Sequence, residues 1–208
     1  MSRAAPPALT LGVLVSGRGS NLRAIIEAIR RGDLAAQMGV IISSKKDAAA
    51  LDHAAGYPTC FVDPARYSDR REYDAVLVET LRNHGVDLVV LAGYMRLVTP
   101  TLIAPYQNRI INIHPSLLPA FPGLHAQRQA LAHGVKVSGC TVHFVDEEMD
   151  HGPIIAQTAV TVREDDTEAS LSARILVEEH RLLPAVIARY AEGELRIEGR
   201  RVAVGASL

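Results

Sequence analysis

The sequence predicts an α/β fold built on an open, mostly parallel β-sheet. In the first half of the chain, short runs of β-branched and other apolar residues alternate with amphipathic segments. Several of the apolar runs have no polar face, as expected for strands that are buried on both sides of a sheet. Turn residues separate most of the segments, so the order of elements is strand, helix, strand.

The strands expected in the first half are apolar runs at residues 11–15, 38–43, 59–62, 87–93 and 109–113. The connecting helices are expected at residues 22–31, 48–55 and 73–84, with a short one beginning at Thr99-Pro100. Gly32 ends the first of these helices. We expect Asp47 to cap the second, with Gly56 at its end. Asp69 and Glu72 have the spacing of a capping box ahead of the third.

The pattern changes after a proline-rich loop at residues 115–123. A helix at 126–133, ending at Gly134, is followed by two runs that alternate like half-exposed strands, at 138–145 and 153–162. An antiparallel pair at the edge of the parallel sheet explains this change.

The last part of the chain is expected to be helical first and extended afterwards. Residues 167–191 have helical periodicity, although Pro184 should kink the helix. The tail that follows alternates around Glu198-Gly199, which is compatible with a hairpin.

The bulk properties favour one small-molecule-binding domain. The chain has 208 residues and a formal net charge of −1, and we expect one domain, 1–208, with a core at about 9–190 and a tail at about 191–208. The near-zero charge disfavours a nucleic-acid partner, and no apolar stretch is long enough for a membrane span or fits a signal peptide. Cys60 and Cys140 are far apart in apolar surroundings, so we expect buried free thiols and a cytoplasmic location.

The segment VSGRGSNL, from Val15 to Leu22, lies where the first strand passes into the first helix. Backbone N–H groups and the helix dipole make such a turn an anion site. A dinucleotide fingerprint would need a third glycine at Leu22 and an acidic residue after the second strand, and neither is present. A single phosphate on a small ligand fits better; a tight turn with a helix cap is the structural alternative.

Asn112 and His114 lie at the end of the strand at 109–113, and residues two apart in an extended chain project to the same side. Ligands bind beyond the carboxyl ends of the strands in open α/β sheets. An amide there can donate to a developing oxyanion, and an imidazole can move protons near neutral pH. A histidine that only hydrogen-bonds the backbone is equally compatible with the sequence.

The acidic segment EEMDHGP, from Glu147 to Pro153, carries the second candidate group. Asp150 would stabilise the protonated ring of His114 and hold its tautomer if the two side chains were close. Asp before a nearby glycine is also common in turns, so the segment by itself leaves a structural role open.

Several histidines raise the alternative of a metal site. No two of them have the one-turn spacing of a helical metal motif, and no cysteine accompanies them, so we expect no metal. His143 alternates with Thr141 and Val145 along an expected strand, which favours a structural role. Cys140 lies inside the same strand, and no Gly-x-Ser-x-Gly elbow occurs, which argues against a covalent nucleophile.

The segments NIHPSLLPAFPG and HFVDEEMDHGPIIAQ resemble the folate-dependent formyltransferase family. The segments VSGRGSNL, VVLAGYMRLV and PGLHAQRQAL, in the same order, resemble the members that formylate glycinamide ribonucleotide in purine synthesis. The resemblance runs from Leu9 to about Tyr190. It implies the formyltransferase fold: a single-domain, Rossmann-like open twisted sheet, mostly parallel with an antiparallel edge, with helices on both faces.

The resemblance also implies which residues make up the site. The catalytic residues would be Asn112, His114 and Asp150. The ribotide would be bound by Gly19, Ser20, Asn21, Pro122, Gly123 and Glu179. Formyl-folate would be bound by Arg70, Met95, Arg96, Leu97, Val98, Asn112, Asp146, Glu147, Glu148, Met149 and Asp150. Arg71, next to Arg70, leaves the register of that arginine open.

The implied reaction is a direct attack of the ribotide amine on the formyl carbon of 10-formyltetrahydrofolate, without an enzyme nucleophile or a metal. The implied partners are these two small molecules, with no nucleic acid and no membrane, and the chain would be a monomer or a homodimer. A methionyl-tRNA formyltransferase would add a C-terminal domain and a formyltetrahydrofolate hydrolase an N-terminal regulatory domain; we expect neither. A non-catalytic phosphosugar or folate sensor is the alternative from another class.

Overall fold

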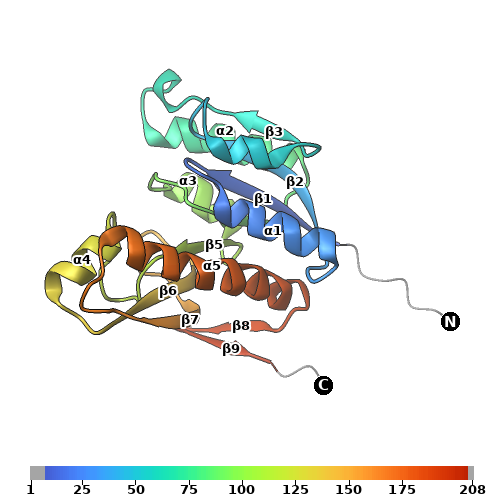
Figure 1. Cartoon of the computed structure of the whole chain (residues 1–208). Coiled ribbons are helices and arrows are strands. Elements are labelled where there is room, and N and C mark those ends of the chain that lie inside the picture. The colour runs from blue at the N-terminus through green and yellow to red at the C-terminus, as the bar shows by residue number, and fades with distance from the viewer. Residues whose placement is uncertain (1–7, 206–208) are drawn as a thin grey trace.

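The computed structural model describes residues 8–205, which form one sheet with helices on both faces (Figure 1). Nine strands follow the order β3-β2-β1-β4-β5-β6-β7-β9-β8. The parallel part contains β1 (Leu9–Val15), β2 (Ala36–Ser43), β3 (Thr59–Phe61), β4 (Leu88–Leu91) and β5 (Ile110–His114). The prediction of a mostly parallel α/β sheet is therefore confirmed. The strand order reverses between β1 and β4, where open α/β sheets bind ligands.

The rest of the sheet contains β6 (Val137–Phe144), β7 (Ile154–Thr161), β8 (Leu195–Glu198) and β9 (Arg201–Val204), of which β9 runs parallel to β7 and antiparallel to β8. β6 is antiparallel to both β5 and β7, as predicted for an antiparallel edge. The predicted hairpin around Glu198-Gly199 is also present and pairs with β7 through β9, so β8 is the outer strand. The prediction that β6 is half-exposed was wrong, because this strand lies inside the sheet and is buried from Ser138 to Phe144.

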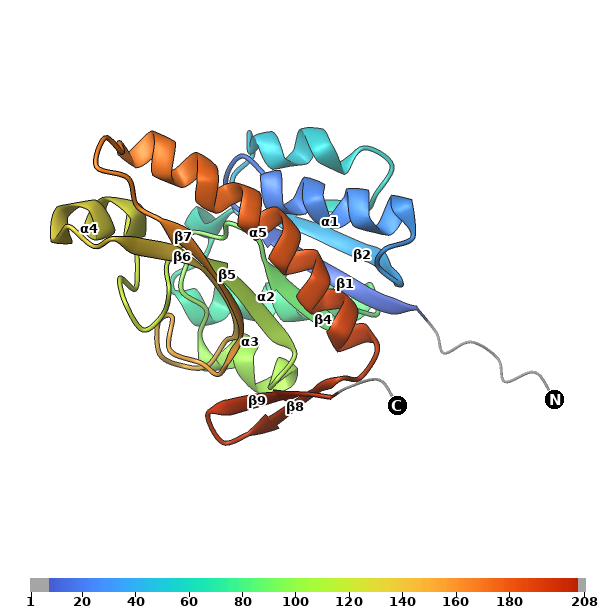
Figure 2. The same cartoon turned by 60° about the horizontal axis from the view of Figure 1, so that its bottom comes forward.

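Helices cover the two faces of the sheet separately (Figure 2). α1 (Ser20–Arg31) and α5 (Glu168–Ala191) lie side by side on one face, and α2 (Arg70–Asn83) and α3 (Pro100–Ile103) lie on the other. α4 (Ala126–His133) packs against α5 beyond the strands. Each face has its own apolar core, with Leu22 and Ile175 in one and Tyr73 and Leu102 in the other.

The segment after β2 differs from the predicted α-helix. It forms a 3₁₀ helix, η1 (Ala49–Ala54), and Asp47 does not cap it. The N–H of Ala50 donates to the carbonyl of Gly17 in the glycine loop, so it is not available to a capping side chain of Asp47. Two further 3₁₀ turns, η2 (Pro64–Arg66) and η3 (Ala104–Tyr106), connect the elements near α2 and β5.

The helix ends follow the expected chemistry with one difference. Asp69 caps α2 by accepting from the N–H groups of Arg71 and Glu72, but Glu72 bonds the N–H of Ser68, so the predicted capping box is incomplete. α5 continues through Pro184.

Both cysteines are free thiols, as predicted, although Cys60 is half-exposed instead of buried. Among residues 8–205, no helix is both long and apolar enough to cross a bilayer.

Candidate active site

A cavity of about 930 Å³ lies at the carboxyl ends of β4 and β5. Its walls come from the residues after β4, the end of β5, the loop before α4, the start of α2 and the acidic loop between β6 and β7. Every residue expected to bind formyl-folate lines this cavity: Arg70, Met95, Arg96, Leu97, Val98, Asn112, Asp146, Glu147, Glu148, Met149 and Asp150. Arg71 lines it as well, so both arginines at the start of α2 are available to a ligand.

β5 places Asn112 and His114 in the wall of the cavity. The strand itself is apolar and buried between β4 and β6, which fixes its position in the sheet. His114 is only 5% exposed. The two side chains are thus presented to the cavity by a rigid element, as a reacting geometry requires.

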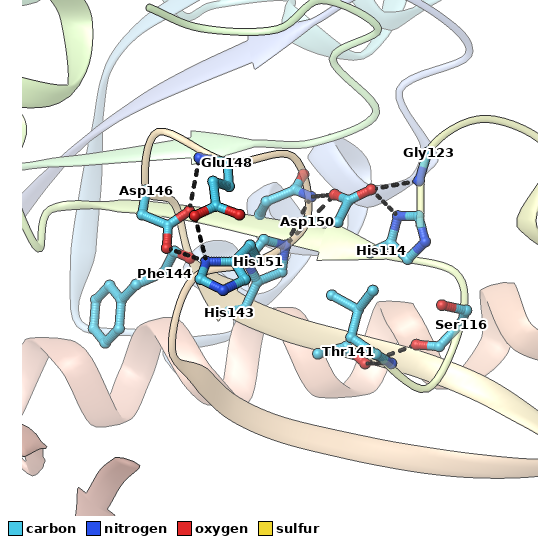
Figure 3. A network of polar contacts seen from close by, with 12 residues as sticks. His114, Ser116, Gly123, Thr141, His143, Phe144, Asp146, Glu148, Asp150 and His151 are labelled. Atoms are coloured by element: carbon cyan, nitrogen blue, oxygen red, sulfur yellow. Dashed lines mark hydrogen bonds and ion pairs between the residues drawn. The ribbon is translucent and has the colours of Figure 1, made fainter. Parts of the chain in front are cut away.

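The carboxylate of Asp150 contacts both of these side chains, and Figure 3 shows it beside His114 and Gly123. Its Oδ2 accepts from the N–H of Gly123 at 2.7 Å and lies 3.4 Å from Nδ1 of His114. Its Oδ1 lies 3.4 Å from Nδ2 of Asn112. The structure therefore brings together the three residues expected to be catalytic, although they come from two segments far apart in the chain.

The ring of His114 lies between two oxygen acceptors. Nε2 donates to the carbonyl of Phe121 at 2.9 Å, and Nδ1 faces Asp150. An imidazole with an acceptor at each nitrogen can hold two protons, and the carboxylate compensates the positive charge. The histidine thus bonds the backbone, as its structural alternative predicts, and also contacts the carboxylate of Asp150.

His143 is a member of this cluster that the sequence did not predict. It lies on β6 directly opposite Asn112 and is 2% exposed. Its Nδ1 donates to the carbonyl of Phe144 at 2.8 Å, and Nε2 accepts from Nδ2 of Asn112 at 3.1 Å. Burial lowers the pKa of His143, which keeps the ring neutral and suited to this accepting role.

Side chains from β6 and β7 hold the proline-rich loop that follows His114. Thr141 Oγ1 donates to the carbonyl of Ser116 at 2.7 Å and accepts from the N–H of Leu118 at 3.1 Å. Gln157 donates to Thr141 Oγ1 and to the carbonyl of Leu118, both at 2.9 Å. These bonds fix the path of the loop and hence the position of the Phe121 carbonyl and the Gly123 amide.

Backbone strain is concentrated at the site. Phe121, His125 and Asp150 have positive φ values of 56°, 58° and 53°. Such conformations are costly for residues with a side chain and persist where the surroundings demand them. At Asp150 the conformation delivers the carboxylate to Asn112 and His114.

The acidic loop is tied to the C-terminal hairpin by its outer residues. His151 Nδ1 lies 2.8 Å from Oδ2 of Asp146, and Figure 3 marks this contact with a dashed line. Arg200, in the turn between β8 and β9, donates to His151 Nε2 and to the His151 carbonyl, both at 2.8 Å. The hairpin therefore contacts the residue that follows Asp150.

The residues expected to hold the ribotide phosphate lie at the start of α1, outside the wall of the large cavity. Gly19 has a φ of +74°, and a Cβ there would lie 2.4 Å from the Cα of Ala50. Ser20 begins the helix, where the first N–H groups have no intrahelical partner. The glycine loop thus has the form of an anion site.

The side chain of Asn21 is bonded to another residue expected to bind the ribotide. Its Nδ2 donates to Oε2 of Glu179 at 2.7 Å, so the structure joins two ribotide candidates that are 158 positions apart. Burial raises the pKa of Glu179, while the bond from Asn21 and the charge of Arg18 act in the opposite direction. Of the remaining ribotide candidates, Gly123 lines the cavity and Pro122 does not.

Between residues 8 and 205, no group of three His, Cys, Asp or Glu side chains is placed to hold a metal ion. Cys140 is buried, and burial raises the pKa of its thiol to about 12. A thiol in that state is a poor nucleophile.

Comparison with known proteins identifies the family. A family model described as formyl transferase matches residues 10–187. A phosphoribosylglycinamide formyltransferase from Escherichia coli (strain K12) is 41% identical over 191 residues, which cover 91% of this chain and 90% of that protein. A trifunctional purine biosynthetic protein adenosine-3 from Homo sapiens is 43% identical over 189 residues, but this chain spans only 19% of its length.

A solved structure supports the same relationship. The crystal structure of glycinamide ribonucleotide transformylase 1 from Symbiobacterium toebii matches with a TM-score of 0.96 and 54% sequence identity. The match covers 97% of this chain and 96% of that one. The fold is thus shared over nearly the whole length of both proteins.

Proposed function

The chain belongs to the formyl transferase family, and on that premise we propose that it transfers the formyl group of 10-formyltetrahydrofolate to the amine of glycinamide ribonucleotide. The products are the N-formyl ribotide of purine synthesis and tetrahydrofolate. One observation supports this proposal above the others: Asn112, His114 and Asp150 meet in the wall of a cavity large enough for a folate.

The cavity has the chemistry that the donor substrate needs. Met95, Leu97, Val98 and Met149 offer apolar side chains to its flat ring system. Arg70 and Arg71 are the first two residues of α2 and line the cavity, where they can pair with the carboxylates of the folate tail. We propose that this cavity binds formyl-folate with its formyl group toward Asn112 and His114.

Asn112 and His114 are proposed to stabilise the oxyanion that forms when the amine attacks the formyl carbon. The N–H of Asn112 that faces Asp150 spans a long 3.4 Å contact, so it is weakly engaged and can donate to an oxyanion that lies closer. The other N–H stays on His143 and keeps the amide in orientation. Preorganised donors of this kind stabilise charge that develops only in the transition state.

Asp150 and His114 are proposed to handle the proton. After the attack, the amine nitrogen must lose a proton and the departing folate nitrogen must gain one. His114 carries that proton directly or through a water, and Asp150 stabilises the imidazolium form. The N–H of Gly123 keeps Asp150 in place during the transfer.

The glycine loop is proposed to bind the ribotide phosphate through backbone N–H groups at the start of α1. Ser20 adds a hydroxyl there. Glu179, held by Asn21, is proposed to contact the ribose or the glycinamide part, beside Pro122 and Gly123.

The two small molecules are proposed as the only partners that the reaction needs, so neither nucleic acid nor a membrane takes part. A monomer or a homodimer, a cytoplasmic location and one domain over 1–208 remain predictions.

The function is tested by mixing the protein with 10-formyltetrahydrofolate, with and without glycinamide ribonucleotide, and following the absorbance of the folate. A change that requires the ribotide supports formyl transfer. A change without the ribotide indicates a hydrolase. No change in either mixture indicates a sensor that keeps the fold without the activity.

A further inference from the structure

Residues 94–99, between β4 and α3, form one wall of the cavity, and little apolar packing holds the middle of this segment. Met95 is 62% exposed and Leu97 is 50% exposed. Side chains left exposed for a ligand contribute little hydrophobic energy to the position of their own backbone. The wall must therefore be held in place by other contacts.

The first part of this wall is tied to β1. The N–H of Met95 donates to Ser16 Oγ at 3.0 Å, and the N–H of Ser16 donates to the carbonyl of Gly93 at 3.2 Å. These bonds fix the point at which the chain leaves the sheet. They do not reach residues 96–99.

Helix α2 holds the rest of the wall from the other side. The hydroxyl of Tyr94 donates to that of Tyr73 at 3.3 Å, and the guanidinium of Arg96 lies 5.0 Å from the centre of the Tyr73 ring. Asp74, the next residue on α2, accepts from Thr99. Helix α2 thus holds the wall at both ends of the stretch that carries Met95, Leu97 and Val98.

The contact of Asp74 is the strongest of these. Oδ2 accepts from the N–H of Thr99 at 2.6 Å and from its hydroxyl at 2.7 Å, and the residue is 1% exposed. Burial raises the pKa of Asp74, whereas the bonds from Thr99 and the charges of Arg96 and Arg70 lower it. A carboxylate taken out of water is expensive unless it is bonded, so Asp74 and the wall stabilise each other.

We propose that Asp74 is a positioning residue for the donor substrate: through Thr99 it fixes the wall at residues 94–99 so that Met95, Leu97 and Val98 fit the ring of formyl-folate. Asp74 does not line the cavity, so it acts through the residues around it, and its only side-chain hydrogen bonds among the described residues are those from Thr99. The inference rests on the proposed function, because its ligand is the formyl donor. It adds a determinant of donor affinity outside the residues that touch the substrate.

The test compares steady-state constants of Asp74→Ala and Thr99→Val with those of the wild type. Loss of the buried bonds should raise the KM for 10-formyltetrahydrofolate about 10-fold in Asp74→Ala and less in Thr99→Val, which keeps the backbone donor. The kcat and the KM for the ribotide should stay within about twofold, because the wall does not touch the acceptor substrate. Thr99→Ser keeps both donors and should recover most of the affinity lost in Thr99→Val.

A matched control is Asp87→Ala. Asp87 also ties two segments together, by accepting from the N–H of Thr10 at 2.9 Å, but it precedes β4 and so lies at the end of the strand away from the cavity. Its removal should leave all three kinetic constants unchanged.

An unchanged KM for 10-formyltetrahydrofolate in Asp74→Ala would overturn the inference. A lower kcat together with higher KM values for both substrates would also overturn it, because that result indicates general damage to the fold. If Asp74→Ala does not fold, Thr99→Val decides the question by the same criteria. If the wild type shows no formyl transfer, the proposed function fails separately. Calorimetric binding of 10-formyltetrahydrofolate to the wild type and to Thr99→Val then still tests whether the wall is positioned for the donor. Equal affinities, or no binding to either protein, would contradict the inference.

Discussion

At the scale of single residues, the amide of Asn112 depends on a neutral partner. His143 offers Nε2 as an acceptor at 3.1 Å, and its Nδ1 proton is engaged by the Phe144 carbonyl. Because burial lowers the pKa of His143, the ring does not turn into a donor near neutral pH. A charged ring there would repel the Asn112 amide and reverse its orientation.

We predict that His143→Ala lowers kcat about 10-fold, since one hydrogen bond of roughly 1.4 kcal/mol then no longer orients Asn112. The ribotide Kd should not change, because His143 is not among the residues expected to bind it. Steady-state kinetics and a binding isotherm measure the two effects. His84→Ala, at the exposed end of α2, is the control. A kcat equal to that of the wild type would show that Asn112 needs no such support.

The sequence predicted part of this cluster for a clear reason. Asn112 and His114 are two positions apart on one strand, so local geometry alone puts both at one cavity. The role of His143 depends on which residue of β6 lies opposite Asn112. That register is set by long-range pairing, which a single sequence does not contain.

At the scale of elements, the start of α1 is joined to the middle of α5. Asn21 on α1 holds the carboxylate of Glu179 on α5, and the two helices pack side by side over the sheet. The sequence predicted both residues as ribotide contacts but could not show that they bond each other, because their contact spans most of the chain. Likewise, the sequence predicted an α-helix where the structure has the 3₁₀ helix η1. The bond between η1 and the glycine loop is a tertiary contact, which the local sequence pattern does not reveal.

We predict that Ser20→Ala and Asn21→Ala each weaken ribotide binding, for different reasons. Ser20→Ala removes a hydroxyl from the phosphate site, whereas Asn21→Ala releases Glu179 and raises the pKa of that carboxyl further. An increase in Kd of about 10-fold is expected for each, which calorimetry with glycinamide ribonucleotide can measure. Isotherms that match the wild type would place the phosphate elsewhere.

The C-terminal hairpin is the element that supports the acidic loop. Arg200→Ala removes two bonds to His151, and His151 is also bonded to Asp146. Because these contacts are exposed, we predict only about a threefold rise in the KM for 10-formyltetrahydrofolate. Arg201→Ala, one position along and directed into solvent, is the control. Equal KM values for the two variants would show that the hairpin does not support the acidic loop.

At the scale of the whole molecule, ionic contacts away from the cavity support the fold. Asp166 accepts from Arg174 Nη1 at 2.8 Å and from Ser170 Oγ at 2.7 Å, and it also bonds Arg174 Nη2. These bonds close the turn before α5, and the Arg174 guanidinium holds the pKa of Asp166 well below its usual value of 3.8. A lowered carboxyl pKa stabilises the folded state above the usual value, and this contribution is lost as the pH falls below it.

We therefore predict that Asp166→Asn lowers the Tm at pH 7 and that the difference from the wild type shrinks at about pH 3 and below. Thermal unfolding followed by circular dichroism measures both. Glu164→Gln is the control, since that side chain is 94% exposed beside Lys136. A deficit of the same size at both pH values would mean that the Asp166 charge does not contribute.

The sheet topology connects these scales. The predicted parallel part places the ends of β4 and β5 beside the reversal in strand order, and the ligand cavity lies there. The alternating pattern of β6 and β7 predicted the antiparallel edge, whose connecting loop carries Asp150 back to β5. The sequence did not predict the contact of α2 with the cavity wall or the contact of Arg200 with His151. Both depend on contacts between distant elements.

The central claim is that His114 and Asp150 carry the chemistry of formyl transfer. The most direct test measures kcat and ribotide Kd for His114→Ala and Asp150→Asn, with circular dichroism to confirm the fold. Loss of an oxyanion donor or of the charge that supports it should lower kcat by about 10²- to 10³-fold while the Kd stays within about twofold of the wild type. Near-wild-type turnover in either variant would contradict the account.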